Sequence, residues 1–400
     1  MLNELKDQVQ REAVSAWVDS GKKGTFELCT GLGKTIASLH CLYTMPKNED
    51  VHLFLAETIE REVDLDRDIL LYNRLFGVDV LKDYRLIFKC YQSVYKVKGY
   101  TVGLVIADEI HCGLSEKYSQ FFSNNTIKAI VGLSATVDRD TSYFIDGRLI
   151  TKGELLDEIA PVCFTYTMSQ SKAAGISRNL NVYVIYQELD KVTKNISAGS
   201  VVRKFFQTEF DSYSYWDKEH RKSWFIEDPD TKSLKIRVTA SKRSKLLFDL
   251  PSKIKTVREL ISKIKGRTIL FGNSLDSLLK ITSNVVSSRY STAQNKAIRD
   301  NFDSGKIDVI GSFKKLRQGT NLPELDNCIV MSYYSSEVHA IQQWGRLRKN
   351  GDKAGSIFIL LTKNTQEEIW FSKMMENMTD FNIIYCNNLE ECIKKYKENE

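Results

Sequence analysis

The sequence has few of the residues that mark fibrous, secreted or membrane-spanning proteins. Its 400 residues include only 5 Pro and 21 Gly, which excludes collagen-like and proline-rich architectures. The longest apolar runs, such as residues 357–361, are far shorter than the roughly 18–20 residues that cross a bilayer. The first twelve residues are rich in charge and lack the apolar core of a signal peptide. We therefore expect a cytoplasmic protein with no membrane partner.

Cysteine pairs and a strong charge imbalance are also missing. The eight cysteines form no CxxC motif, so we expect reduced thiols and no zinc site. The 57 Lys and Arg against 51 Asp and Glu leave a net charge of only +6, which does not by itself indicate a nucleic-acid partner. With 42% apolar and 27% charged residues, the composition is that of a globular protein with two to three domains of about 150 residues.

Short apolar runs alternate with longer amphipathic stretches in both the first and the last third of the chain. The strand-sized runs are residues 53–56, 104–107, 130–133, 268–271, 309–312, 328–332 and 357–361. Such alternation is typical of parallel sheets covered by helices. We predict an α/β protein with one domain over residues 1–165 and another over 251–400. Residues 166–250 are expected to form a connecting segment with a variable insert.

A glycine loop separates a strand-like run at residues 25–28 from a helix-like stretch at 36–43. Residues 28–35 read LCTGLGKT. Glycines allow backbone N–H groups to close on phosphates, and the start of a helix adds partial positive charge. Lys34 would reach the β- and γ-phosphates, and the Thr35 hydroxyl would bind Mg²⁺. Because Leu28 replaces the first Gly of the strict GxxxxGK[ST] pattern, a chance glycine turn is the alternative for this motif alone.

Two carboxylates follow directly after the apolar run at residues 104–107. Asp108 and Glu109 should therefore lie at the carboxyl edge of a parallel sheet, where α/β proteins bind ligands. Asp108 can hold Mg²⁺, and Glu109 can act as the general base that polarises an attacking water. A solvated acidic turn is the alternative.

Together with the Ser-Ala-Thr triplet at residues 134–136, these motifs resemble those of superfamily 2 helicases of the DExH kind. Residues 342–348 (QQWGRLR) resemble motif VI of that family, and residues 318–323 (QGTNLP) resemble motif V. Residues 268–274 (TILFGNS) resemble motif IV, and Gln10 resembles the Gln that reads adenine. The compact length is similar to that of bacteriophage UvsW-like DNA helicases, which remodel branched DNA.

The resemblance implies two RecA-like parallel-sheet domains in tandem, with an accessory region between them, that clamp ATP and Mg²⁺. His111 would contact Gln342 across the cleft, without a metal at the neighbouring Cys112. The residues implied in catalysis are Lys34, Glu109, Arg346 and Arg348. The residues implied in nucleotide binding are Gln10, Thr30, Gly31, Gly33, Lys34, Thr35, Asp108 and Gln342, of which Thr35 and Asp108 would hold Mg²⁺. Those implied at the nucleic-acid backbone are Thr58, Arg61, Ser93, Gly319 and Thr320.

The expected insert is rich in aromatic and basic residues. Eight of the 25 residues from 201 to 225 are aromatic, and residues 242–267 carry nine Lys and Arg against two acidic residues. Tyr213, Tyr215 and Trp216 could stack on bases or separate a duplex, but we favour a small hydrophobic core. The basic run could follow a phosphate backbone or form a solvated helix face.

The motifs favour an enzyme that uses ATP to unwind or branch-migrate forked or branched DNA in replication, recombination or repair. An RNA helicase would have the same ATP site, and a restriction-like nuclease could use the chain as its motor subunit. A binding module with a relic nucleotide site is disfavoured because Lys34, Glu109 and Arg346 are all present. We expect a monomer that works with replication or recombination proteins, in the host cytoplasm if the protein is viral.

Overall fold

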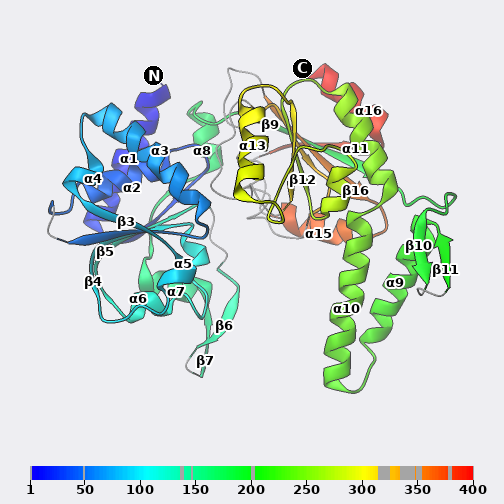
Figure 1. Cartoon of the computed structure of the whole chain (residues 1–400), viewed down its shortest axis with the longest axis horizontal. Helices are drawn as coiled ribbons and strands as arrows, with labels where there is room; N and C mark the ends of the chain where they lie inside the picture. The colour runs from blue at the N-terminus through cyan, green and yellow to red at the C-terminus, as the bar shows by residue number, and fades with distance from the viewer. Residues whose placement is uncertain are drawn as a thin grey trace. The chain divides into compact units, whose positions relative to one another are not determined.

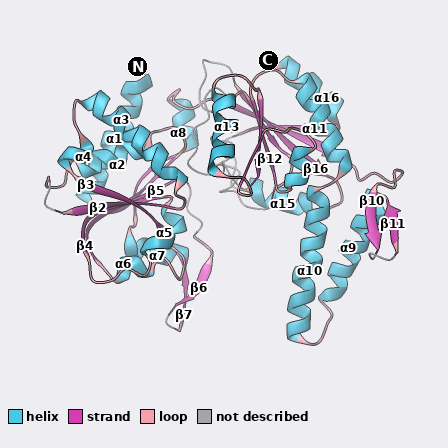
Figure 2. Cartoon of the chain, in the orientation of Figure 1, coloured by secondary structure: helices cyan, strands magenta, loops and turns pink. Residues whose placement is uncertain are grey.

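The computed structural model describes residues 2–47, 50–135, 139–145, 147–199, 203–313, 325–333, 347, 354–376 and 381–399. The chain divides into two compact units between Arg178 and Asn179. Each unit is built around one parallel sheet (Figure 1) (Figure 2). Among these residues, no helix has the length and apolar character needed to span a membrane.

The first unit contains a six-stranded parallel sheet in the order β3-β2-β4-β5-β1-β8. Its strands are β1 (Lys23–Leu28), β2 (Val51–Ala56), β3 (Arg85–Cys90), β4 (Thr101–Asp108), β5 (Thr126–Ser134) and β8 (Val162–Tyr166). Its helices are α1 (Leu2–Asp19), α2 (Lys34–Leu42), α3 (Glu60–Phe76), α4 (Val80–Asp83), α5 (Tyr91–Val94), a 3₁₀ turn η1 (Ile110–Cys112), α6 (Gln120–Ser123), α7 (Lys152–Ile159) and α8 (Met168–Ala173). A small antiparallel hairpin joins β6 (Ser142–Ile145) to β7 (Arg148–Thr151).

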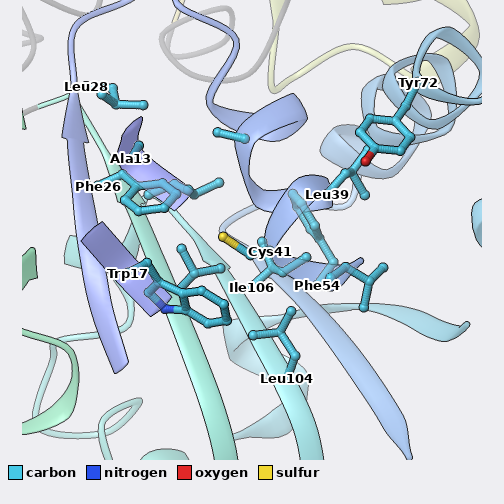
Figure 3. Packing of buried hydrophobic residues seen from close by; sticks show 14 of the residues in the cluster. Ala13, Trp17, Phe26, Leu28, Leu39, Cys41, Phe54, Tyr72, Leu104 and Ile106 are labelled. Atoms are coloured by element: carbon cyan, nitrogen blue, oxygen red, sulfur yellow. The ribbon is translucent and has the colours of Figure 1, made fainter. Parts of the chain in front are cut away.

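Strand β4 is buried on both faces, as expected for a central strand of a parallel sheet. Leu104 and Ile106 face one hydrophobic cluster, in which Trp17 packs beside them (Figure 3). Val105 and Ala107 face a second cluster on the opposite side of the sheet. The period of two along the strand therefore explains why residues 104–107 read as an uninterrupted apolar run.

The second unit contains a seven-stranded parallel sheet in the order β13-β14-β12-β15-β16-β9-β17. Its strands are β9 (Leu180–Gln187), β12 (Thr268–Gly272), β13 (Val285–Ser287), β14 (Val309–Phe313), β15 (Asn327–Val330), β16 (Gly355–Thr362) and β17 (Asn382–Cys386). Its helices include α11 (Pro251–Lys263), α12 (Leu275–Leu279), α13 (Thr292–Asp303), α15 (Gln366–Met375) and α16 (Leu389–Glu398). The two sheets confirm the predicted α/β fold with two parallel-sheet domains.

The position of β9 differs from the domain boundaries expected from the sequence. Residues 180–187 fall within the expected connecting segment, yet they pair with β16 on one side and β17 on the other. Val182 and Val184 belong to the core of the second unit. This unit therefore begins before the insert, and the insert interrupts it.

The insert consists of a small β-hairpin followed by two paired helices. Strands β10 (Ile196–Gly199) and β11 (Lys204–Gln207) are antiparallel. Helices α9 (Glu209–Ser223) and α10 (Pro229–Phe248) pack along each other and extend away from the second sheet (Figure 1). The Asp228 carboxylate accepts a hydrogen bond from the Thr231 N–H at 2.8 Å and so caps the start of α10.

The aromatic residues of the insert divide into a buried group and an exposed group. Tyr213 is 6% exposed and packs with Leu247 and Leu250, and its Oη accepts a hydrogen bond from the Gln366 N–H at 2.7 Å. Trp224 and Phe225, in the turn between α9 and α10, are 54% and 85% exposed. Tyr213 therefore fastens the base of the helical pair, whereas its tip presents aromatic rings to solvent.

Glu209 joins three segments at the base of the helical pair. Its side chain has no exposed surface. One carboxylate oxygen accepts the Ser252 N–H at 2.8 Å, and the other accepts the Asp190 N–H at 3.0 Å and the Ser252 hydroxyl at 2.8 Å. This carboxylate of α9 thus binds the segment that follows β9 and the first turn of α11. It fixes the three segments relative to one another.

We expect Glu209→Gln to destabilise the second unit. An amide keeps one acceptor oxygen, so at least one buried donor loses its partner, at a cost of about 1.5–3 kcal/mol for a hydrogen bond to a charged group. Denaturant unfolding should show a lower midpoint for this variant. Glu227→Gln, at an exposed position in the turn of the helical pair, is the control and should unfold like the unaltered protein. An unchanged midpoint for Glu209→Gln would contradict the role of this carboxylate.

Candidate nucleotide-binding site

Four loops of the first unit gather at one edge of its sheet. Because all strands of the sheet are parallel, their carboxyl ends lie at the same edge. Residues 29–33 follow β1 and lead into α2. Residues 57–59 follow β2, Glu109 follows β4 and Ala135 follows β5. The glycine loop and the acidic pair that the sequence singles out therefore belong to one site.

The glycine loop turns tightly around the start of α2. Gly31 and Gly33 have φ angles of +90° and +80°, a left-handed conformation that favours glycine. The Gln10 amide donates a hydrogen bond to the Leu32 carbonyl at 2.7 Å, and a Cβ at Gly33 would lie 2.6 Å from Gln10 Nε2. Gln10, expected to read adenine, thus holds the loop against α1. Lys34, the first residue of α2, donates to the Leu28 carbonyl at 3.3 Å.

The two residues expected to hold Mg²⁺ both contact the same guanidinium group. Thr35 and Asp108 are each 8% exposed, at the start of α2 and the end of β4. Arg61 Nε donates to Asp108 Oδ2 at 2.7 Å, and Arg61 Nη2 donates to Thr35 Oγ1 at 2.6 Å. Arg61, expected at the nucleic-acid backbone, therefore lies between these two oxygens, with its side chain only 10% exposed.

A second carboxylate supports the charge of Arg61. Burial opposes that charge, but the carboxylates of Asp108 and Asp68 outweigh it and raise the pKa of the guanidinium. Asp68 Oδ2 lies 3.5 Å from Arg61 Nη2. Sequence reasoning missed Asp68, although its position seven residues after Arg61 puts both residues on one face of α3.

Glu109 has an unusual backbone conformation at the end of β4. Its φ angle is +47°, in the left-handed region that non-glycine residues rarely adopt. Its Oε2 lies 3.6 Å from His111 Nδ1, which in turn lies 3.3 Å from Ser134 Oγ. Tyr91, which sequence reasoning missed, donates its buried hydroxyl to the Asp108 carbonyl at 3.0 Å. The turn that carries both carboxylates is therefore held by contacts on either side.

Glu57 lies close to this turn, immediately after β2. Burial raises the pKa of its carboxyl group, against a smaller opposing hydrogen bond from the Cys112 thiol. Thr58 and Ser93, expected at the nucleic-acid backbone, are both exposed, and Ser93 Oγ donates to the Cys90 carbonyl at 2.7 Å. They follow the carboxyl ends of the neighbouring strands β2 and β3.

Apart from Thr30, the other sequence-predicted residues that the structure describes lie outside the first unit. Thr30 belongs to the glycine loop. Tyr215 and Trp216 lie on α9 of the second unit, where their rings meet edge to face, with Lys242 near the Trp216 ring. The predicted residues outside the described part of the chain are Thr136, Gly319, Thr320, Gln342, Arg346 and Arg348.

Two family models match the chain in succession. The model described as "Type III restriction enzyme, res subunit" matches residues 4–139. The model described as "Helicase conserved C-terminal domain" matches residues 252–351. The first match spans the glycine loop and the acidic pair, and the second spans the segments that resemble motifs IV to VI.

A similar curated protein is the DNA 3'-5' translocase XPB2 of Sulfurisphaera tokodaii. It is 25% identical over 382 residues, which cover 91% of this chain and 83% of the relative.

Solved structures share the fold at low sequence identity. Dbp5 of S. cerevisiae bound to RNA and ADP BeF3 has a TM-score of 0.61 and 12% identity, over 98% of this chain and 92% of that one. The helicase domain of Pyrococcus furiosus Hef has a TM-score of 0.52 and 13% identity, over 92% and 96%. The Type ISP restriction-modification enzyme LlaBIII bound to DNA has a TM-score of 0.60 and 14% identity, and this chain covers 32% of its length.

These likenesses agree with the arrangement of the chain itself. The two parallel sheets are those of tandem RecA-like domains. A glycine loop and an acidic pair meet at the edge of the first sheet, within the segment matched by the first family model. From the two successive family models and the relative that spans both of them, we conclude that the chain is a superfamily 2 helicase, an enzyme that hydrolyses ATP.

Proposed function

We propose that this helicase is an ATP-dependent DNA translocase that unwinds or branch-migrates forked or branched DNA. The observation that carries the proposal is the convergence of Lys34, Thr35, Asp108 and Glu109 at one edge of the first sheet. In the proposed roles, Lys34 holds the β- and γ-phosphates and Glu109 takes a proton from the attacking water.

The donor set at this edge fits Mg²⁺. The metal prefers oxygen ligands, and the Thr35 hydroxyl and the Asp108 carboxylate approach closely enough to share one guanidinium. When bound there with ATP, Mg²⁺ would neutralise phosphate charge. The glycine loop leaves its backbone N–H groups free of side-chain bulk, since neither Gly31 nor Gly33 carries a Cβ.

The remaining catalytic groups of the proposal come from the second family match. Arg346 and Arg348 would stabilise the charge that develops on the γ-phosphate, as arginine fingers do. Gln342 would contact His111, which lies between Glu109 and Ser134 in the first unit. Such contacts would couple hydrolysis to movement of the two domains.

Lys34→Ala and Glu109→Gln should fail in different ways. Lys34→Ala removes the cation that holds the phosphates, so both ATP binding and turnover should be lost. Glu109→Gln keeps the shape but removes the base, so ATP should bind and persist while turnover falls by about 10²–10⁴-fold. Fluorescent-nucleotide binding and single-turnover hydrolysis separate the two results. Turnover near the unaltered rate in either variant would refute the corresponding role.

DNA is the favoured nucleic acid because of the named relatives. The relative that covers most of this chain is named a DNA translocase, and the LlaBIII structure contains DNA. The Dbp5 structure contains RNA, so an RNA helicase is the second candidate. The rate of ATP hydrolysis should be measured with single-stranded DNA, duplex DNA, forked DNA and RNA. We expect the greatest stimulation by forked DNA, and stimulation by RNA alone would favour the second candidate.

The tip of the insert is a further candidate for strand separation, in addition to Tyr215 of α9, which is 51% exposed. Tyr213 is part of a core, so replacing it would destabilise the insert. Trp224 and Phe225 are exposed and follow two basic residues, Arg221 and Lys222. Exposed rings can stack on bases, which is worth about 1–3 kcal/mol per base.

Replacing both Trp224 and Phe225 with Ala should impair unwinding without loss of stability. ATP hydrolysis stimulated by single-stranded DNA should stay near the unaltered rate, because the tip takes no part in the nucleotide site. Strand separation of a forked substrate should fall by about tenfold or more, the equivalent of one stacked base. Leu234→Ala, which removes another exposed apolar side chain of α10, is the control. Normal fork unwinding by the double variant would reject the tip as the separating element.

A further inference from the structure

The side chain of Arg61 lies where the proposed function requires a metal ion. Its guanidinium donates to Asp108 Oδ2 at 2.7 Å and to Thr35 Oγ1 at 2.6 Å, the two oxygens that would bind Mg²⁺. Magnesium binds its oxygen ligands at about 2.0–2.1 Å, so it cannot share both oxygens with a guanidinium in this position. The two cations therefore compete for one point at the carboxyl edge of the first sheet.

We propose that Arg61 is a displaceable plug of the magnesium position, which must leave Thr35 and Asp108 before Mg²⁺ and ATP bind fully. This inference rests on the proposed function, because it assigns the same two oxygens to Mg²⁺. The plug supplies a positive charge to the buried Asp108 carboxylate while nucleotide is absent, and it makes binding of the metal conditional on its release.

A second carboxylate, that of Asp68, can pair with the guanidinium of Arg61 when it is not in contact with Asp108. Asp68 lies on the same face of α3, and its Oδ2 is 3.5 Å from both Nη1 and Nη2 of Arg61. The Asp68 side chain is 34% exposed, against 11% for Asp108. A guanidinium displaced from Asp108 can therefore keep Asp68 as its partner while it turns toward solvent. In the observed position, where Arg61 contacts Asp108 and Thr35, its guanidinium lies 5.5 Å from the centre of the Phe54 ring.

The chemistry of the plug differs from that of a structural ion pair. A structural pair would be expected to stay closed when ligand binds, and its removal would weaken the site. A plug opposes ligand binding, so its removal should strengthen the site toward the competing cation only. The sign of the effect on metal-dependent binding therefore separates the two roles.

The test is the affinity for a fluorescent, non-hydrolysable ATP analogue as a function of Mg²⁺, without nucleic acid. Arg61→Met keeps most of the side-chain length but cannot donate to Thr35 or Asp108. We define the midpoint for Mg²⁺ as the Mg²⁺ concentration that gives half of the maximal binding of the analogue. For Arg61→Met we expect a midpoint about tenfold lower than that of the unaltered protein, which corresponds to roughly one hydrogen bond to a charged group. In EDTA the two proteins should bind the analogue equally. Arg67→Met, an exposed arginine of the same helix, is the matched control and should leave the midpoint unchanged.

A second pair of variants keeps the test decisive if Arg61→Met proves unstable. Asp68 is one of two carboxylate partners while Arg61 contacts Asp108, but the one that remains after Arg61 leaves Asp108. Asp68→Asn should therefore destabilise the displaced position more than the closed one, and the midpoint for Mg²⁺ should rise. In the Arg61→Lys background, Asp68→Asn should raise the midpoint for Mg²⁺ by less than it does in the unaltered protein. The reason is that a single ammonium cannot bridge Thr35 and Asp108 as a guanidinium does. An additive effect of the two changes would overturn the proposal.

The outcomes distinguish this inference from the proposed function. A midpoint for Arg61→Met that equals or exceeds that of the unaltered protein would overturn the plug while leaving the nucleotide site intact. Failure of the unaltered protein to bind the analogue at any Mg²⁺ concentration would instead overturn the proposed function. A gain in affinity that persists in EDTA would also overturn the plug, since competition with the metal requires the metal.

Discussion

The parallel direction of the strands in the first sheet is the constraint on which the site depends. Four loops reach the same edge only because β1, β2, β4 and β5 all end there. Strand β4 is buried from Val102 onward, and its only charged residue is the one at which it ends. Asp108 is the last residue of β4. Glu109 follows it with a left-handed backbone conformation, which non-glycine residues rarely adopt. The burial of β4 thus leaves the two carboxylates at its carboxyl end as the first charged groups after Thr101.

The second unit meets a different requirement, which is to hold an insert without disturbing its sheet. The insert leaves after β9 and returns before α11, and the buried carboxylate of Glu209 binds backbone at both points. Tyr213 adds a hydrogen bond to the start of α15. The base of the helical pair is therefore rigid, and a rigid base can transmit movement of the unit to the exposed tip. A base held by exposed ion pairs alone would be weaker, since such pairs contribute little stability.

Much of this arrangement follows from local patterns in the sequence, but the exceptions share a physical cause. The run at residues 104–107, the glycine loop and the acidic pair are local, because each is determined by burial or by backbone geometry over a few residues. The place of β9 is not local, since its partner β16 begins about 170 residues later and the insert hides their relation. The aromatic segment at 201–225 was also ambiguous. Tyr213 is buried on α9 and Trp224 is exposed in the turn that follows α9, a difference that composition does not reveal.

Arg61 shows how charge balance can govern a site that sequence motifs describe only in part. A buried carboxylate without a counter-charge costs several kcal/mol, so Asp108 needs a cation whether or not a metal is bound. Arg61 meets that need in this structure, and Asp68 gives the same guanidinium an anionic partner nearer to solvent. The motifs name the residues that bind the nucleotide but not those that keep the site neutral without it. Arg61 supplies the positive charge that balances Asp108, and Asp68, two turns further along α3, keeps that guanidinium in contact with a second carboxylate.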